Sequence, residues 1–399
     1  MKKKLLGISF AMLFALIASA SNPIYLWYNV PDFGGGLYRY STGFFSIGSK
    51  GYAGVGYDGS AHHDWWEYDP LNTTWTQKAN FPGPNCWSVQ GFTIDSLGYI
   101  INGTTPTYVT GVYKYDPSTN IWTTLNNFPG PSRQDAAYFS INHKGYICCG
   151  YSSIYRGDLW EYDPVTDSWT QKAPFPGGAR SGVVSFVINN IAYVGTGYDG
   201  SSPKTDFYAY DPVTNMWTQI ADFPGNARLS GVGFQMKGKG YAGIGYNNST
   251  TYFLDMFEYD PATNSWTQII NFPDKGRTYP FIWELNDEAY VGTGRDYNYQ
   301  YLTDVHRLTI SNIGVDENEL KTLDVKISNQ LDIISFEFTL DKPETCKIEI
   351  YDLNGKLLST QSYNQMNVRF DLTTNHLSKG HYFYKIKSNS QYKAGSFNY

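Results

Sequence analysis

Five arginines recur along the chain at similar intervals, and their type and spacing are the first indication of chemistry. They are Arg39, Arg133, Arg180, Arg228 and Arg277, and Cys86 takes the corresponding place in one further copy. A guanidinium group binds carboxylates through paired hydrogen bonds, so arginines facing one channel would form a site for acidic ligands. Alternatively, each arginine bonds local carbonyl groups or a periodic aspartate. Those aspartates are Asp64, Asp158, Asp206, Asp255 and Asp304. Repetition in nearly every unit favours the bracing role, because a ligand lacks that symmetry.

Tyrosines in the longer segments between expected strands form a second candidate site. The chain has 35 Tyr and 11 Trp, which is more than a core requires, although most should pack between sheets. Each ring combines an apolar face with a polar group, and this suits contact with sugars or an extended peptide. Variable loops on a rigid scaffold commonly carry binding residues. The candidates are Tyr108, Tyr252, Tyr297, Tyr299 and Tyr301.

The sequence gives little support for metal or cofactor chemistry. The adjacent His62 and His63 lie in one of these segments, but neighbouring side chains diverge in an extended chain, so we do not expect them to share a metal. The four cysteines have no C-x-x-C spacing and form no disulfide framework, because Cys148 and Cys149 are adjacent and Cys346 follows the repeats. We therefore expect no metal, no cofactor and small buried thiols.

A repeated unit must position these residues. The step Tyr-Asp-Pro begins at Tyr68, Tyr115, Tyr162, Tyr210 and Tyr259. A tryptophan follows each step seven residues later, after turn residues such as Asp-Pro-x-Thr-Asn. Upstream, two further short strand patterns occur six times, with an aromatic residue at the centre of the first. Such a period, with few helical signals, predicts four-stranded sheets repeated around an axis.

The strand counts predict how the ring closes. Six copies of the first two strands are present, but only five complete copies of the last two. We expect the third strand of the sixth sheet at residues 304–308, and the fourth strand of that sheet near the N-terminus. There, Trp27 and Phe33 have the same spacing as Trp217 and Phe223. An N-terminal strand would complete the last sheet and remove the open edges. The prediction is an all-β, six-bladed propeller closed by its N-terminal strand.

The repeat resembles the kelch motif over residues 27–308. Its second strand ends in glycines and is followed by a spaced Tyr and a spaced Trp, with Gly195-Thr196-Gly197 in place of the usual adjacent glycines. The chain is therefore expected to have the kelch type of propeller. It is also similar to the central domain of galactose oxidase and to the sialic-acid epimerases of the kelch class. Because one fold hosts many activities, this resemblance specifies function poorly.

The two enzyme resemblances imply different sites. An epimerase needs a carboxylate near channel arginines. One column of the first strands reads Ser46, Thr93, Ser140, Val187, Gln235 and Glu284. Glu284 is its only acid and is therefore the sole candidate general base, with a solvated or paired carboxylate as the alternative. Galactose oxidase implies copper held by Tyr and His with a Tyr–Cys cross-link, and the sequence shows no such constellation.

Both ends of the chain indicate export. Residues 1–20 have the charged start, apolar stretch and small-residue cleavage site of a signal peptide. The propeller is expected over residues 21–310 and a polar linker over 311–322. Residues 323–399 alternate as strands do, which predicts a small β-sandwich.

The last eighty or so residues closely resemble the type A C-terminal sorting domain of the type IX secretion system. The matching stretches are residues 348–356, residues 377–380 with Tyr382, and a final strand at 392–397. The resemblance implies the secretion machinery as a partner, passage across the outer membrane, and release or attachment at the cell surface.

Charge and hydropathy exclude some classes of partner. The net charge is −6 and no basic run is present, which argues against nucleic acid. No apolar run after the leader is long enough to span a bilayer. We therefore predict an exported propeller that binds a carbohydrate or protein ligand, with an enzyme acting on sugars as the alternative.

Overall fold

The computed structural model describes residues 23–311 except 102 and 105–107, and residues 321–398 except 324, 331–332, 342, 344, 353–356, 375–376, 378 and 389–390. Apart from one short 3-10 helix, η1 (Phe33–Gly35), the regular elements in these ranges are β-strands. They form two compact units, and the larger spans Tyr25–Ile310. The expected signal peptide and most of the expected linker lie outside the described residues.

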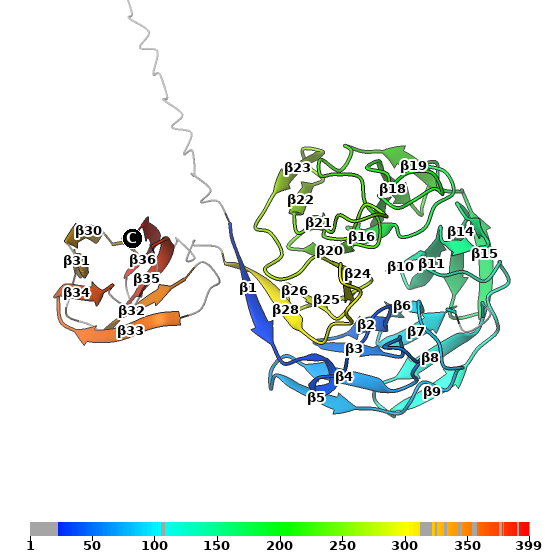
Figure 1. The fold of residues 1–399 in the computed structure, drawn as a ribbon, viewed down its shortest axis with the longest axis horizontal. Helices are drawn as coiled ribbons and strands as arrows, with labels where there is room; N and C mark the ends of the chain where they lie inside the picture. The colour runs from blue at the N-terminus through cyan, green and yellow to red at the C-terminus, as the bar shows by residue number, and fades with distance from the viewer. Residues whose placement is uncertain are drawn as a thin grey trace, which may run out of the picture. The chain divides into compact units, whose positions relative to one another are not determined.

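Six four-stranded antiparallel sheets build the larger unit (Figure 1). From the centre outward, the first is β2 (Gly43–Ile47), β3 (Lys50–Gly54), β4 (Trp65–Asp69) and β5 (Thr74–Gln77). The second is β6 (Gln90–Ile94), β7 (Leu97–Ile101), β8 (Val112–Asp116) and β9 (Ile121–Thr124). The third is β10 (Ala137–Ile141), β11 (Lys144–Cys148), β14 (Leu159–Asp163) and β15 (Ser168–Lys172).

The remaining three sheets repeat this arrangement. The fourth is β16 (Val184–Ile188), β17 (Ile191–Gly195), β18 (Phe207–Asp211) and β19 (Met216–Gln219). The fifth is β20 (Val232–Met236), β21 (Lys239–Gly243), β22 (Met256–Asp260) and β23 (Ser265–Gln268). The sixth is β25 (Phe281–Leu285), β26 (Glu288–Gly292), β28 (Val305–Ser311) and β1 (Ile24–Val30). Its outermost strand therefore comes from the N-terminus.

The sheets form a closed ring. Their inner strands contact one another in the order β2, β6, β10, β16, β20 and β25, and β25 contacts β2 again. On β1, Trp27 is 3 % exposed, and its ring lies 5.1 Å from that of Phe272. Phe33, just after β1, packs edge-on against Trp75 of the first sheet at 5.1 Å. The N-terminal segment thus connects the last blade to the first.

Aromatic residues at the centre of each inner strand fill the space between blades. Side chains of an inner strand alternate between the channel and this space, as in β16, because successive residues of a strand point to opposite faces. Phe186 on β16 packs against Gly240 on β21 of the next blade. A Cβ on Gly240 would lie 2.1 Å from the Phe186 ring. A small residue at this place is therefore needed for the blades to approach.

The Tyr-Asp-Pro repeat forms a turn and a contact between blades. The Asp211 carboxylate accepts the Val213 N–H at 2.8 Å, which fixes the turn between the third and fourth strands. Asn215 then accepts the N–H of Ala173 in the preceding blade at 3.0 Å, and the Trp217 indole donates to the carbonyl of the same Ala173 at 2.9 Å. The motif recurs because each blade must hold its neighbour.

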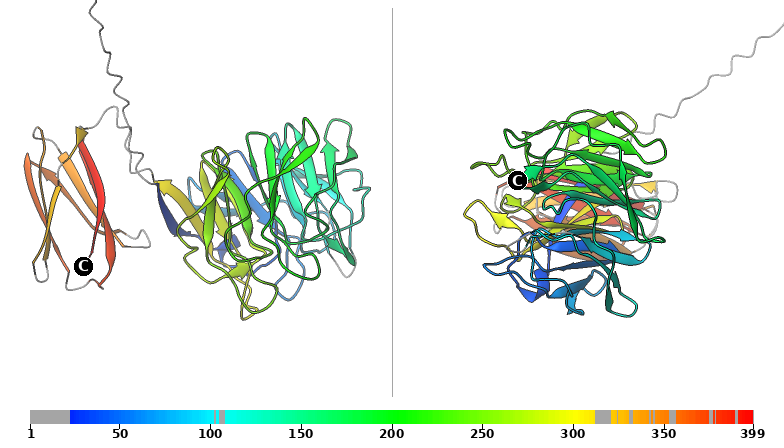
Figure 2. Two further views of the ribbon diagram at one scale, coloured as in Figure 1. Left: turned by 90° about the horizontal axis from the view of Figure 1, so that it is seen from above. Right: turned by 90° about the vertical axis from the view of Figure 1, so that its right-hand side faces the viewer.

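Two sheets form the C-terminal unit, and the prediction of a β-sandwich is confirmed. One sheet orders β29 (Lys321–Thr322), β36 (Gln391–Asn398), β35 (His381–Lys387), β32 (Thr345–Tyr351) and β33 (Leu357–Asn364). The other orders β30 (Val325–Gln330), β31 (Ile333–Thr339) and β34 (Asn367–Thr373). Phe336 of the smaller sheet packs on Tyr384 and Phe397 of the larger at 5.2 and 5.4 Å. Figure 2 shows these strands from two further directions.

Candidate functional site

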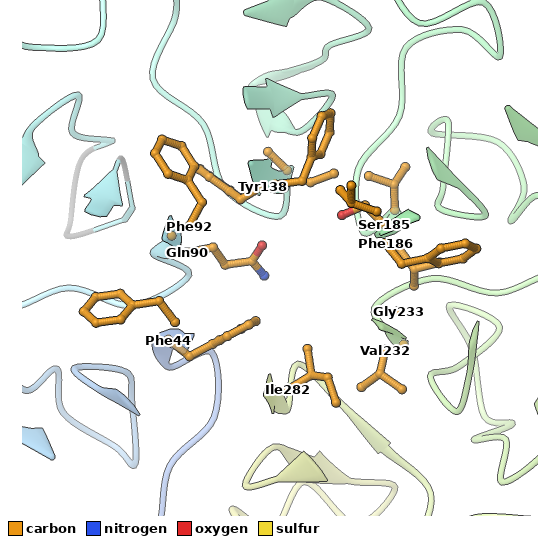
Figure 3. A pocket seen from close by; sticks show the side chains of 18 of the residues that line it. Phe44, Gln90, Phe92, Tyr138, Ser185, Phe186, Val232, Gly233 and Ile282 are labelled. Carbon is orange, nitrogen blue, oxygen red and sulfur yellow. The ribbon is translucent and has the colours of Figure 1, made fainter. Parts of the chain in front are cut away.

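A cavity of about 370 Å³ follows the centre of the ring and is lined by the six inner strands and the residues that precede them (Figure 3). Its volume falls in the range typical of small-ligand sites. The lining side chains form three successive layers, because alternate residues of each inner strand face the centre. The layers differ in chemistry.

The first layer, which we call the throat, lies where the chain enters each inner strand. It consists of Ser41, Ser88, Asp135, Gly182, Ser230 and Tyr279, of which the last four line the cavity. All six have a left-handed backbone, with φ between 52° and 65°. Five backbone N–H groups in this layer donate to the carbonyl of a neighbouring blade's throat residue at 2.8 to 3.2 Å, as Ser230 does to Gly182. The throat is therefore a hydrogen-bonded belt around the channel.

The second and third layers continue down the inner strands. The second consists of Phe44, Gly91, Tyr138, Ser185, Gly233 and Ile282. The third consists of Ser46, Thr93, Ser140, Val187, Gln235 and Glu284. The amide of Gln90, at the start of β6, also reaches toward the open centre (Figure 3). The channel thus combines aromatic faces with hydroxyl and amide groups, and both kinds of group can contact a polar organic ligand.

The two carboxyl groups of the cavity are Asp135 in the throat and Glu284 in the third layer. Burial raises the pKa of Asp135 to about 7, against hydrogen bonds from Gln134, Ser88 and Tyr279 that lower it. Burial likewise raises the pKa of Glu284 to about 7, and a hydrogen bond from the Gln235 N–H, 2.6 Å from Oε1, opposes this shift. The candidate residue Glu284 therefore does face the channel.

Replacing Glu284 with glutamine is expected to stabilise the protein at alkaline pH. The carboxyl pKa rises from its ordinary 4.5 to about 7 on folding, so between these values the folded state keeps a proton that the unfolded state has lost. Stability contributed by this group is therefore present at low pH and is lost as the pH rises through that window. Glu284→Gln should gain up to about 3 kcal/mol over the wild type at pH 8 and little at pH 4.

Denaturant unfolding at the two pH values measures this difference. Asp135 titrates over the same window in both proteins, so its contribution cancels when the wild type is subtracted from the variant. The quantity to compare at pH 4 and pH 8 is therefore the difference in unfolding free energy between variant and wild type. An equal difference at pH 4 and pH 8 would contradict a buried, cation-free Glu284.

Aromatic residues surround the mouth of the channel on the throat side. Short bridges pair the residue after each repeated arginine position with the first residue of the following loop, as in Tyr40 with Tyr57 and Leu229 with Tyr246. The loop then folds back on itself, as in Tyr246 with Tyr252. We call the aromatic residues of these bridges the crown. They are Tyr40, Tyr57, Trp87, Tyr108, Tyr151, Tyr155, Tyr198, Tyr246, Tyr252 and Tyr301.

The crown residues are half-buried and contact one another. Tyr40 stacks on Tyr301 with ring centroids 5.5 Å apart, and Tyr57 lies 5.1 Å from Trp87. Arg295 places its guanidinium 5.2 Å from the Tyr40 ring and 4.9 Å from that of Tyr299. These contacts hold the rings in fixed orientations around the mouth, which lowers the entropic cost of binding a ligand to them.

The structure brings the tyrosines predicted from the sequence to this face. Tyr108, Tyr252 and Tyr301 belong to the crown. Tyr297 and Tyr299 lie on the loop between β27 (Arg295–Asp296) and Tyr301, and are 58 % and 66 % exposed. All five candidates therefore lie on loops at the mouth, and two of them present open rings.

The repeated arginines do not line the cavity. Arg228 is 1 % exposed and donates to both carboxylate oxygens of Asp255 at 2.7 and 2.8 Å and to the Ile244 carbonyl at 3.2 Å. Its guanidinium also lies 4.5 Å from the Phe223 ring.

The other members of the set have equivalent partners. The pairs are Arg39 with Asp64, Arg133 with Asp158, Arg180 with Asp206, and Arg277 with Asp304. The ligand-binding hypothesis for Arg39, Arg133, Arg180, Arg228 and Arg277 is thus corrected. Each brace is enclosed within its own blade, because its carbonyl and carboxylate partners follow the second strand of that blade.

Asp135, Gln90 and Arg295 are site residues that reasoning from the sequence missed. A usable signal was present for Asp135. The place two residues after the repeated arginine is Ser, Gly or Tyr in the other blades, so a carboxylate there is an exception. Arg295 takes a place that is tyrosine in four other blades. A departure from the repeat at a channel position was therefore more informative than the repeat itself.

One cluster within the described ranges has the composition of a metal site. Asp274, Asp304 and His306 bring three ligand atoms within 4.8 Å of one another. However, the Arg277 guanidinium donates to both aspartates, at 3.1 and 2.6 Å, and His306 Nε2 lies 2.6 Å from Asp304. The Arg277 guanidinium already compensates these carboxylates, and His306 bonds Asp304 as well. We read the cluster as an extension of the Arg277 brace.

The adjacent histidines have separate partners. His62 Nε2 bonds Asp58 at 2.7 Å, whereas His63 Nδ1 bonds Asn85 at 2.9 Å. Their side chains do not converge on a common ligand. The geometry gives no basis for deriving copper chemistry from this pair.

Comparison with known proteins supports the fold and the tail. Residues 179–224 match the family described as "Kelch motif", and residues 327–396 match the family described as "Secretion system C-terminal sorting domain". A solved structure titled "Structure of YjhT" superposes with a TM-score of 0.62 over 71 % of this chain and 99 % of its own, at 16 % identity. No curated protein sequence matches the chain.

The chain is a kelch-type β-propeller with a C-terminal sorting domain. The sorting domain indicates type IX export to the cell surface or the extracellular space. Within the part of the chain that the structure describes, no helix is long and apolar enough to cross a membrane. At 16 % identity the structural neighbour shows only that this chain has the fold of a kelch propeller. Because one fold hosts many functions, the evidence for function lies in the crown and the cavity of this chain.

Proposed function

We propose that the kelch propeller is an extracellular glycan-binding module whose ligand lies on the crown and enters the throat. The observation that carries this proposal is a mouth surrounded by half-buried tyrosines above a cavity lined with hydroxyl, amide and carboxyl groups. Tyrosine faces stack on the C–H faces of sugar rings, and the polar groups below can bond sugar hydroxyls. A cavity of about 370 Å³ has room for one or two sugar units.

The charge of the channel argues against the alternative of an epimerase-like enzyme. That alternative requires Glu284 and several arginines to converge in the channel. Glu284 lines the cavity, but the described residues that line it with Glu284 include no arginine, because the five repeated arginines are paired with aspartates inside the blades. An acidic sugar in the channel would therefore meet two carboxyl groups without a compensating cation, which disfavours its binding there.

Substitution of the exposed mouth tyrosines tests the proposal. A glycan array should first identify ligands of the purified protein, and titration calorimetry should then measure the dissociation constant. We expect Tyr299→Ala and Tyr297→Ala each to weaken binding about tenfold, or ~1.4 kcal/mol, since aromatic side chains commonly dominate such contacts. Both side chains are more than half exposed, so the fold should be unaffected.

Tyr38→Ala is the matched control. Tyr38 is 59 % exposed, and no ring contact joins it to the crown among the described residues. It should bind the glycan like the wild type. An array without glycan ligands, or mouth variants that bind as tightly as the wild type, would contradict the proposal.

A further inference from the structure

The charge of the channel is one-sided. Asp135 and Glu284 line the cavity, whereas its lining includes no lysine, arginine or histidine within the described part of the chain. Neither carboxyl group takes part in an ion pair among those residues. By contrast, the carboxylates that brace each blade internally are paired, as Asp255 is with Arg228 at 2.7 Å. The channel is therefore the place where acidic groups face an open volume without a cation.

Asp135 is surrounded by neutral donors and aromatic rings. It is 9 % exposed and accepts hydrogen bonds from the Gln134 amide, 3.3 Å away, and from the hydroxyl groups of Ser88 and Tyr279. The phenol groups of Tyr40, Tyr108 and Tyr246 are near enough to interact electrostatically with it. These three tyrosines belong to the crown, so a ligand seated on the crown would come near the carboxyl group.

A carboxylate among tyrosine faces has the chemistry of an ammonium site. A cation is attracted to the negative face of an aromatic ring, and the interaction strengthens when water is excluded. A charge-assisted hydrogen bond to the carboxylate adds to it. Crown rings already accept one cation, because Arg295 lies over Tyr40 at 5.2 Å. A calcium ion would need six to eight oxygen ligands, which a single carboxylate with neutral donors does not offer.

We infer that the throat is a subsite for a protonated amine, so that the preferred ligand is a glycan carrying a free amino group. The inference rests on the proposed glycan-binding function and specifies its ligand class. The ammonium group would donate to Asp135 and lie against Tyr279, while the rest of the sugar would contact the crown. N-acetylation removes the positive charge and should remove the preference.

The pH dependence follows from the groups near Asp135, namely Tyr40, Tyr108, Tyr246 and Tyr279, with Arg295 lying over the Tyr40 ring. Burial raises the pKa of Asp135 to about 7, and it also raises the pKa values of these four tyrosines, which therefore stay neutral near neutral pH. Affinity for the amine should rise from pH 5 to pH 7 as Asp135 ionises. It should fall again at higher pH as the amine loses its proton.

Calorimetric titration of the full chain with two matched probes tests the subsite. The probes are a glucosamine tetrasaccharide and its fully N-acetylated counterpart, which share a backbone and differ in charge. At pH 7 we expect the wild type to bind the free-amine glycan about 10-fold more tightly or better. Asp135→Asn should bind both glycans equally.

Asp287→Asn is the control for charge, because it removes one negative charge from an exposed turn at the opposite face and recreates the Asn-Asn turn of Asn189 and Asn190. It should keep the wild-type preference. Equal binding of the two probes by the wild type, or a preference that survives in Asp135→Asn, would overturn the amine subsite and leave glycan binding intact. Failure of both probes to bind would overturn the proposed function as well.

Discussion

Arg228→Met is expected to lower the free energy of unfolding by about 3–5 kcal/mol, because it leaves the Asp255 carboxylate without its buried partner. Arg228 is 1 % exposed and bonds Asp255, the Ile244 carbonyl and the Asn226 carbonyl, so its removal leaves several acceptors unsatisfied. Methionine keeps most of the side-chain volume and the contact with Phe223, which isolates the loss of the charge.

Denaturant unfolding followed by tryptophan fluorescence measures this effect in the full chain. All 11 tryptophans precede residue 284, so the signal reports on the propeller alone. The double variant Arg228→Met/Asp255→Leu should be more stable than the single variant, because it removes the unpaired charge as well. A single variant within 1 kcal/mol of the wild type would contradict the bracing role, and would return the arginines to the set of ligand-binding candidates.

Trp27→Ala should destabilise the ring at its closing contact, also by about 3–5 kcal/mol. Trp27 is 3 % exposed and packs on Phe272 in the hydrophobic core between the fifth and sixth blades. Leu308 and Ile310 of β28 belong to the same core. Removing the indole leaves a cavity beneath β1, the strand on which closure depends. The prediction is checked by the same unfolding measurement.

Limited proteolysis distinguishes loss of closure from general weakening. In Trp27→Ala, early cleavage should fall within residues 24–33, because β1 can detach while the other blades stay formed. Trp217→Ala is the comparison, since Trp217 occupies the equivalent place on β19 inside the chain and its indole bonds Ala173. Cleavage of the two variants at the same sites would show that β1 has no special role in closure.

The propeller could be predicted from the sequence because its main contacts are local and repeated. Asp211 and Asn215 use turn chemistry that a sequence displays directly, and Trp217 follows at a fixed distance. The closing strand could be inferred from counting, since an unpaired Trp27 had no other place in the repeat.

The throat could not be predicted in the same way. Left-handed backbone is usually signalled by glycine, but here Ser41, Asp135 and Tyr279 adopt it. Nothing in these residue types shows that six such positions meet around one axis. For the arginines, the repetition favoured the bracing role but left ligand binding open as an alternative. Their spacing was visible, but whether Arg228 faced the channel or its own blade depended on where the Ile244 carbonyl lies.

Closure by β1 also constrains how the chain folds. This strand belongs to the first part of the propeller to be synthesised, yet its partner β28 (Val305–Ser311) belongs to the last. The pairing has one of the greatest sequence separations in the chain, so the loop entropy lost in forming it is large and folding should be slow. Until residue 311 is synthesised, Trp27 and its neighbours have no sheet to pair with. A nascent propeller therefore exposes an apolar, unpaired strand that a chaperone can bind.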